Sequence, residues 1–446
     1  MRAGARGAPE IAVSNVRRAR HRGDARAQEV PEDGLHQVRR QIHPGTCHVS
    51  TLYPAENTML DMKQFHGRLN DLDSHIQPSL SNYEVAAGET GRNFANAIRG
   101  ALQTLPPDAA RKLSGLIGEE SSEFTEETVW KTKGASAPGS FTPEGRLRTL
   151  DLMGVRRALI FSDPGIQAAS FAPGELGVAT MRHWNDFALR FGGHDRDRLR
   201  VAALLNTHDI DVATAEAERV LAAGGRAFVF ASSVAPGQLS PAHERMDRIW
   251  GMISEARATA LLHIGGEHGF MGSDAWARGV DHLEFQPHDF TSETEQINTY
   301  TFASFHYAPQ NFISTLVLGG VFERFPDLRF GAIELGAGWL APMAERLDQV
   351  ASLYARRLAP VLSLRPSEYI RRNVRVTPFR IEPVATYIDR YGFDECYCFS
   401  SDFPHPEGGV EPLKEFRQNI ERLGQGAAEK LFVKNAEWVL PALSEN

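Results

Sequence analysis

The chain has 446 residues, of which 42% are hydrophobic and 23% are charged, with a formal net charge of −8 and a pI near 6.1. These values are typical of a globular protein with a substantial core, and the acidic balance argues against nucleic acid as a partner. No apolar run approaches the length of about 18 residues that a membrane-spanning helix needs, so no membrane partner is expected and a cytoplasmic location is the default. The three cysteines, Cys47, Cys396 and Cys398, are too few for a disulfide framework and indicate buried thiols.

Residues 1–58 differ in composition from the rest of the chain. They hold nine arginines and no lysine, few large apolar residues, and no steady period of two or 3.6. The arginine bias suits an organellar presequence, but acidic residues such as Glu10 and Asp24 weaken that interpretation. We expect a disordered, non-functional amino-terminal extension, followed by a functional chain at 59–446 that opens at Met59 or Met62.

From Leu69 onward, apolar runs typical of strands alternate with helical patterns. Strands are expected at 69–75, 155–161, 199–205, 227–231, 260–266, 326–334, 374–377 and 396–400. Helices are expected at 88–105, 107–117, 146–153, 179–191, 212–223, 247–257, 300–322, 340–357, 382–391, 412–423 and 427–432. Eight strands, each followed by helix, predict a distorted (β/α)8 TIM barrel of the α/β class in one domain. The barrel would carry a helical insertion after strand 1 and a long loop after strand 5, at 267–300, where we expect a substrate lid.

Several of the expected strands end in residue types that bind metals. Asp71, Asp73 and His75 fall on one face of the first strand, His263 ends the fifth, and Asp402 follows the last. The carboxyl ends of barrel strands form one mouth, so these side chains would converge, and a cation would offset the cost of grouping acids there. The alternative is structural: the acids simply begin the first strand, His75 is a satisfied core histidine, and Asp402 belongs to an ordinary turn.

Three more residues are candidates for catalysis. Glu334 ends the sixth strand, His405 follows Asp402 by three residues, and His306 lies in a helical pattern after the long loop. His405 stands between two prolines and His306 suits a core position, so each also has a purely structural interpretation.

Six segments together resemble the amidohydrolase superfamily, specifically the amidohydrolase-2 branch that includes aminocarboxymuconate-semialdehyde decarboxylase and the resorcylate decarboxylases. The segments are Asp71-Leu-Asp-Ser-His-Ile-Gln-Pro78, Leu152-Met-Gly-Val-Arg-Arg-Ala-Leu-Ile160, Leu262-His263, Gly320-Val-Phe-Glu-Arg-Phe-Pro-Asp-Leu328, Glu334-Leu-Gly-Ala-Gly-Trp339 and Ser401-Asp-Phe-Pro-His-Pro-Glu-Gly408. The resemblance covers residues from about 68 to 440.

The resemblance implies one catalytic divalent metal, with zinc favoured and manganese as the alternative, bound by Asp73, His75, His263 and Asp402. The sequence departs from the family pattern in two places. The first-strand motif is commonly His-x-His, whereas Asp73 stands in the first place here. Related decarboxylases carry a catalytic histidine at the end of the sixth strand, whereas this chain has Glu334.

We therefore expect a metal-dependent hydrolase or carboxy-lyase (decarboxylase) that acts on a small carboxylated or cyclic organic molecule. In a lyase, Asp402 would move a proton to the carbon that loses carbon dioxide; in a hydrolase, Asp402 would act as base toward a metal-bound water and Glu334 would help move protons. A metal-free barrel with a binding or assembly role is the alternative of a different class. The sequence leaves a homodimer open.

Overall fold

The computed structural model describes residues 60–284 and 298–443, which belong to one compact unit. The expected extension at 1–58 lies outside the described residues, as do His288 and Asp289 of the expected lid.

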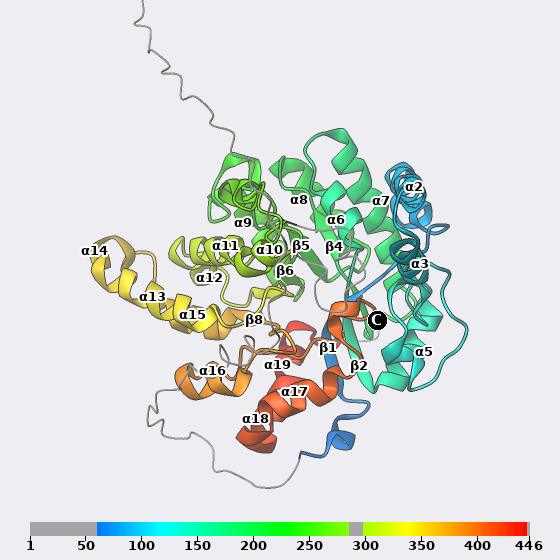
Figure 1. The fold of residues 1–446 in the computed structure, drawn as a ribbon. Helices are drawn as coiled ribbons and strands as arrows, with labels where there is room; N and C mark the ends of the chain where they lie inside the picture. The colour runs from blue at the N-terminus through cyan, green and yellow to red at the C-terminus, as the bar shows by residue number, and fades with distance from the viewer. Residues whose placement is uncertain (1–59, 285–297, 444–446) are drawn as a thin grey trace, which may run out of the picture. The chain divides into compact units, whose positions relative to one another are not determined.

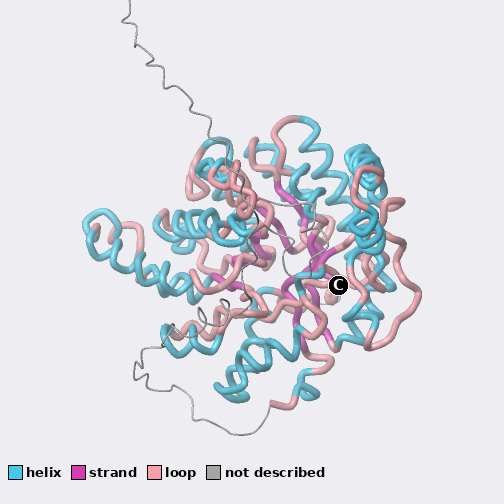
Figure 2. Tube along the Cα trace, in the orientation of Figure 1, coloured by secondary structure: helices cyan, strands magenta, loops and turns pink. Residues whose placement is uncertain are grey.

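Parallel strands form the centre of this unit, and helices surround them (Figures 1 and 2). The strands are β1 (Leu69–His75), β2 (Val155–Phe161), β3 (Leu199–Val201), β4 (Ala203–Leu205), β5 (Ala227–Phe230), β6 (Thr259–His263), β7 (Arg329–Ile333) and β8 (Val374–Val376). One sheet has the order β1-β2-β3 and the other the order β4-β5-β6-β7-β8, with every pair parallel. Their residues are almost all buried, as expected for strands covered by helices on one side and by barrel core on the other.

The strand expected at 199–205 is interrupted at Ala202, which separates β3 from β4. The amide of Ala202 donates to the carbonyl oxygen of Ile160 (2.8 Å), so the chain still follows β2 across the interruption. The indole of Trp184 donates to the carbonyl oxygen of Ala202 (3.0 Å), which satisfies the group that the broken ladder leaves open. The two sheets are therefore continuous through this segment.

The strand expected at 396–400 is not a regular strand. Single parallel bridges join Tyr397 to Val376 of β8 and Phe403 to Ser74 of β1, and the amide of Leu72 donates to the carbonyl oxygen of Phe399 (3.2 Å). This segment thus takes the eighth place between β8 and β1, which accounts for the (β/α)8 barrel predicted from the sequence. The pairing with β1 ends at Phe403, because Asp402 before it has a left-handed backbone (φ 52°) and Pro404 after it offers no amide hydrogen.

The helices fill the connections between strands. They are α2 (Tyr83–Leu102), α3 (Pro107–Leu116), α4 (Thr128–Lys131), α5 (Pro143–Met153), α6 (Pro164–Ser170), α7 (Glu175–Gly192), α8 (Ile210–Ala222), α9 (Asp247–Glu255), α10 (Thr299–Ser304), α11 (Tyr307–Leu318), α12 (Val321–Arg324), α13 (Leu340–Leu353), α14 (Ala355–Leu358), α15 (Pro366–Asn373), α16 (Val384–Tyr391), α17 (Pro412–Ile420), α18 (Gly424–Glu429) and α19 (Asn435–Val439). Helices α2 to α4 form the insertion expected after strand 1, and α5 corresponds to the helix expected at 146–153. The single helix expected at 300–322 is three, in part because Gly320 has a left-handed backbone (φ 72°) between α11 and α12.

The carboxy-terminal helices return to the start of the barrel. Helix α19 contacts β1 and β7. The side-chain amide of Asn435 donates to the carbonyl oxygens of Asp394 and Tyr397 (both 2.7 Å), which anchors α19 to the irregular eighth segment. Asn435 is therefore structural. None of the helices in the described ranges has both the length and the apolar character needed to cross a bilayer.

Candidate metal centre

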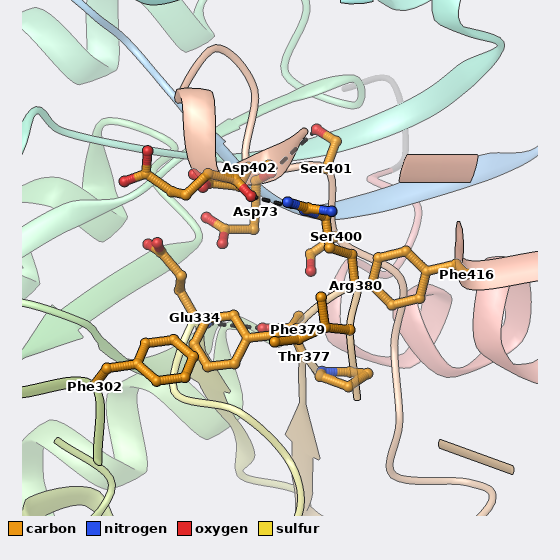
Figure 3. A pocket seen from close by; sticks show the side chains of 14 residues that line it. Asp73, Phe302, Glu334, Thr377, Phe379, Arg380, Ser400, Ser401, Asp402 and Phe416 are labelled. Atoms are coloured by element: carbon orange, nitrogen blue, oxygen red, sulfur yellow. Dashed lines mark hydrogen bonds between the residues drawn. The ribbon is translucent and has the colours of Figure 1, made fainter. Parts of the chain in front are cut away.

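Six chemically active side chains meet at the carboxyl ends of the barrel strands. Asp73 and His75 come from β1, His263 ends β6, Glu334 directly follows β7, and Asp402 and His405 belong to the irregular eighth segment. All six residues are buried. The carboxylates of Asp73, Glu334 and Asp402 face one common space (Figure 3). The convergence predicted from the strand ends is thus present, with Glu334 and His405 added to it.

The potential ligand atoms fall into two overlapping groups. The first consists of Asp73, His75, His263 and Glu334, and the second of His75, Glu334, Asp402 and His405; within each group all ligand atoms lie within 4.8 Å of one another. Three of the four ligands implied by the family resemblance are in the first group. Asp402, the fourth, joins them through His75, since its Oδ1 lies 3.4 Å from His75 Nε2.

The separations match those of ligands around one cation. Nε2 of His75 lies 3.3 Å from Asp73 Oδ1 and 3.8 Å from Glu334 Oε2. Nε2 of His263 lies 3.4 Å from each of the same two oxygens. Two ligands that each bind a metal at about 2.0–2.2 Å are about 3–3.5 Å apart when adjacent in a tetrahedral or octahedral shell. A single divalent ion fits among these atoms.

Hydrogen bonds elsewhere on the two imidazoles prepare them as ligands. Nδ1 of His75 faces the carbonyl oxygen of Ser162 (3.1 Å), and Nδ1 of His263 faces that of Ile264 (3.0 Å). A carbonyl only accepts, so in each neutral ring the proton is on Nδ1 and the lone pair of Nε2 points into the centre. His75 Nε2 and Glu334 Oε2 are buried and make no hydrogen bond. Buried polar atoms are normally satisfied, so this pair of atoms supports a cation between them.

The pKa values of the centre without a cation also indicate that positive charge is needed there. Burial raises the pKa of Glu334 far above its ordinary value, and the charges of Asp402 and Asp73 raise it further. Burial acts to lower the pKa of His75, but its contacts with Asp402 and Asp73 outweigh burial and raise that pKa to about 10. Without a cation, protons bound to Glu334 and His75 therefore offset the negative charge of the centre. Binding of a cation would release these protons.

Asp402 and His405 form a pair at the edge of the centre. Oδ1 of Asp402 lies 2.9 Å from His405 Nδ1, and Nε2 of His405 lies 3.2 Å from the side-chain oxygen of Gln77. The ring of His405 stacks on that of His75 with centroids 3.9 Å apart. Burial acts to raise the pKa of Asp402, but His405 and His75 hold it well below its usual range. The pair is a short path for a proton between the centre and Gln77.

His306 lies elsewhere. It is half-buried at the start of α11, its ring contacts Phe305 and Tyr307, and it belongs to neither group of potential ligands. Burial lowers its pKa. Its catalytic role stays a prediction without a contact to the centre in the described residues.

A buried carboxylate beneath the centre connects β1 to the eighth segment. Asp71 accepts hydrogen bonds from the amide of Ser401 (2.8 Å), the hydroxyl of Ser401 (2.5 Å) and the amide of Asp73 (3.1 Å). The amide of Asp402 in turn donates to the carbonyl oxygen of Asp73 (2.8 Å). Asp73 and Asp402, two of the predicted ligands, are 329 positions apart in sequence and are thereby fixed at one spacing. The sequence placed Asp71 on the right strand, but Ser401 as its partner was not predicted.

A pocket of about 130 Å³ opens on Asp73, Glu334 and Asp402 (Figure 3). Its remaining wall is largely apolar and includes the rings of Phe302 and Phe379, whose centroids are 5.2 Å apart. Sequence reasoning missed Phe379, although it follows Thr377, the residue after β8, and the strand-end rule that found the ligands would have pointed to it. Phe302 belongs to α10, just after the expected lid region at 267–300; the lid role of that region stays a prediction.

A parallel α/β barrel with imidazole and carboxylate ligands at the carboxyl ends of its strands defines a class of metal-dependent enzymes. The family model described as amidohydrolase matches residues 161–442, so the chain belongs to the amidohydrolase family. This confirms the resemblance inferred from the motifs. The protein is a metal-dependent enzyme of that family, a hydrolase or a decarboxylase.

Solved structures share the fold. An amidohydrolase from Mycobacterium avium subsp. paratuberculosis K-10 is 17% identical with a TM-score of 0.60, over 84% of this chain and 99% of that one. The 5-carboxyvanillate decarboxylase from Sphingomonas paucimobilis is 16% identical with a TM-score of 0.52, over 84% and 99%. The dihydroxybenzoic acid decarboxylase from Polaromonas sp. JS666, with bound manganese and the inhibitor 2-nitroresorcinol, is 15% identical with a TM-score of 0.54, over 84% and 96%. Among curated proteins none matches the chain.

Proposed function

We propose that the protein decarboxylates a small aromatic or cyclic acid that carries one carboxylate, with a divalent metal held by Asp73, His75, His263 and Asp402. The observation that carries this proposal is the ring-sized, aromatic-walled pocket that opens on Asp402. A cavity of about 150 Å³ accommodates benzene in another protein, so a pocket of about 130 Å³ suits a single ring. The decarboxylase names of two structures with the same fold support the choice.

The charges around the pocket favour an acid with one carboxylate. Arg380 is the basic side chain among the described residues that line it, but its Nη1 is bound to both carboxylate oxygens of Glu415 (2.9 and 2.8 Å) and its Nε to the carbonyl oxygen of Glu407 (3.0 Å). Its charge is therefore already compensated. One substrate carboxylate would find its partner at the metal, whereas a second would face carboxylates.

The residues divide the work as follows. When bound, a divalent cation supplies a Lewis acid that polarises a substrate oxygen. The rings of Phe302 and Phe379 hold the substrate ring beside the centre. Asp402 relays a proton from His405 to the ring carbon that bears the carboxylate, the bond to that carboxylate breaks, and its electron pair returns to the ring as carbon dioxide leaves. His405 takes a replacement proton on the side of Gln77.

Hydrolysis is the second candidate, and Glu334 is the observation that favours it. A carboxylate stands where related decarboxylases carry a histidine, and a carboxylate beside the ligands is suited to move protons during hydrolysis. Asp402 would then be the base, and the product would carry one oxygen from solvent.

One experiment separates the two reactions. Single-ring monocarboxylic acids, and the matching esters, lactones and amides, would be offered to the purified protein in ¹⁸O-labelled water. We expect carbon dioxide release and one solvent hydrogen on the product ring, without ¹⁸O in that product. Incorporation of ¹⁸O into the product would show hydrolysis and would overturn the proposed decarboxylation.

Two variants test the metal-dependent mechanism. We expect His263→Ala to lose bound metal and Asp402→Asn to lose at least about 10²-fold in turnover, because a ligand and the proton donor are removed. Both variants should retain the far-UV circular dichroism of the parent. Full activity of a metal-free His263→Ala protein would exclude the proposed mechanism.

A further inference from the structure

We propose that Glu334 is itself a ligand of the metal, so that three carboxylates and two imidazoles form the centre and favour manganese over zinc. This inference rests on the metal-dependent function proposed for the chain. It gives Glu334 a different role from the catalytic one predicted from the sequence.

The position of Glu334 is equivalent to that of a ligand. Its Oε2 lies 3.4 Å from His263 Nε2 and 3.8 Å from His75 Nε2. Oδ1 of Asp73, a ligand by family resemblance, lies 3.4 and 3.3 Å from the same two atoms. A cation bound between Asp73 and the two imidazoles is therefore within reach of Glu334 as well.

The orientation of the two imidazoles supports a cation at this contact. In their neutral forms both rings carry the proton on Nδ1, because each Nδ1 faces a backbone carbonyl oxygen. In this tautomer their Nε2 atoms direct lone pairs into the centre, as the ligands of a cation do. Oε2 of Glu334 is buried without a hydrogen bond, and the side chain is 94% buried. A shared cation satisfies both kinds of atom.

The loop that carries Glu334 is fixed by its own hydrogen bonds. The amide of Glu334 donates to the Thr377 hydroxyl (2.8 Å), which fixes the backbone at this residue. The backbone of Glu334 is left-handed, with φ 55°. The amides of Ala337 and Gly338 donate to Glu382 (3.0 Å each). These hydrogen bonds hold the Glu334 carboxylate in the centre. On a mobile loop the same carboxylate would turn toward solvent.

Five protein ligands change the metal that fits. Zinc sites in proteins hold four ligands, and a catalytic zinc site uses about three protein ligands plus a water. Asp73, His75, His263, Glu334 and Asp402, together with a substrate oxygen, would form a six-coordinate shell rich in oxygen, which suits manganese.

The test is metal binding rather than activity. Protein freed of metal by a chelator would be titrated with Mn²⁺ and with Zn²⁺ by calorimetry, and Mn²⁺ binding would be followed by electron paramagnetic resonance. We expect Glu334→Gln to weaken Mn²⁺ binding at least about 100-fold and to weaken Zn²⁺ binding less, because outer residues alone change metal affinity about 10–100-fold.

Two further variants distinguish ligation from charge. Glu407→Gln removes a neighbouring carboxylate that lines the same pocket but belongs to neither ligand group, and we expect a change below about tenfold. Glu334→Asp keeps the charge and withdraws the oxygen, so it should weaken Mn²⁺ binding nearly as much as Glu334→Gln.

The outcomes separate this inference from the proposed function. Parent protein that binds neither metal would overturn both. Parent protein that binds Mn²⁺, with Glu334→Gln or Glu334→Asp binding it equally well, would overturn only the ligand role of Glu334. The ligand role of Glu334 would also be overturned if the parent protein prefers Zn²⁺ and Glu334→Gln leaves that preference unchanged.

Discussion

Arg146 shows how much of the centre depends on one side chain that is not a ligand. It is fully buried, its Nε donates to the carbonyl oxygen of Gly139 (2.6 Å), and its Nη1 donates to the hydroxyl of Ser74 (3.2 Å). Its Nη2 donates to the carbonyl oxygen of His75, one of the proposed ligands. Burial lowers the pKa of Arg146 to about 10, so the guanidinium keeps its charge at neutral pH. The guanidinium of Arg146 thus satisfies hydrogen-bond acceptors at the end of β1.

Replacement of this guanidinium should be costly. We expect Arg146→Met to lower the free energy of unfolding by about 3–5 kcal/mol, because several buried acceptors lose their donor at once. The matched control is Arg111→Met, whose side chain is 78% exposed and should matter by less than about 0.5 kcal/mol. Urea denaturation measures both, and equal midpoints for the two variants would contradict this role of Arg146.

At the scale of elements, α2 is a helix with a built-in break. Ala87 (φ −138°) and Gly88 (φ 59°) depart from helical geometry, and the turn brings the carbonyl oxygen of Tyr83 against Gly91. A Cβ at Gly91 would lie 1.9 Å from that oxygen. Because the break interrupts the helical pattern, the sequence predicted a helix that starts at Gly88, whereas α2 starts at Tyr83.

Two glycines of this helix should respond in opposite ways to alanine. We expect Gly91→Ala to destabilise by about 1–3 kcal/mol, since backbone must move to admit the methyl group. A Cβ at Gly100 meets no atom within 4 Å, so Gly100→Ala should stabilise by about 0.5–1 kcal/mol through helix propensity. Both values come from denaturant unfolding; a neutral Gly91→Ala would mean that the break is not required.

At the scale of the whole molecule, the described residues already hold the barrel, its insertion and the complete centre. Every ligand proposed for the metal comes from residues 73–402, and the barrel closes on itself between β8 and β1. The composition of residues 1–58 predicts that they add nothing to this core.

A chain that begins at Met59 tests that prediction. We expect its free energy of unfolding and its metal content to match those of the full chain within about 0.5 kcal/mol and within measurement error, respectively, because no apolar pattern in 1–58 supplies packing. Calorimetry and metal analysis on both proteins give the answer. Loss of metal or of cooperative unfolding on truncation would show that the extension is part of the functional unit.

The sequence by itself determined the barrel and the strand ends on which Asp73, His75, His263 and Asp402 lie, because burial on both faces of a strand and the polar residue that ends it are local patterns. Only the tertiary structure placed Glu334 against two imidazole lone pairs, paired Asp71 with Ser401, and compensated Arg380 with Glu415. Those relations join residues up to 330 positions apart, as Asp71 and Ser401 are, and their geometry depends on how the barrel closes rather than on any local period.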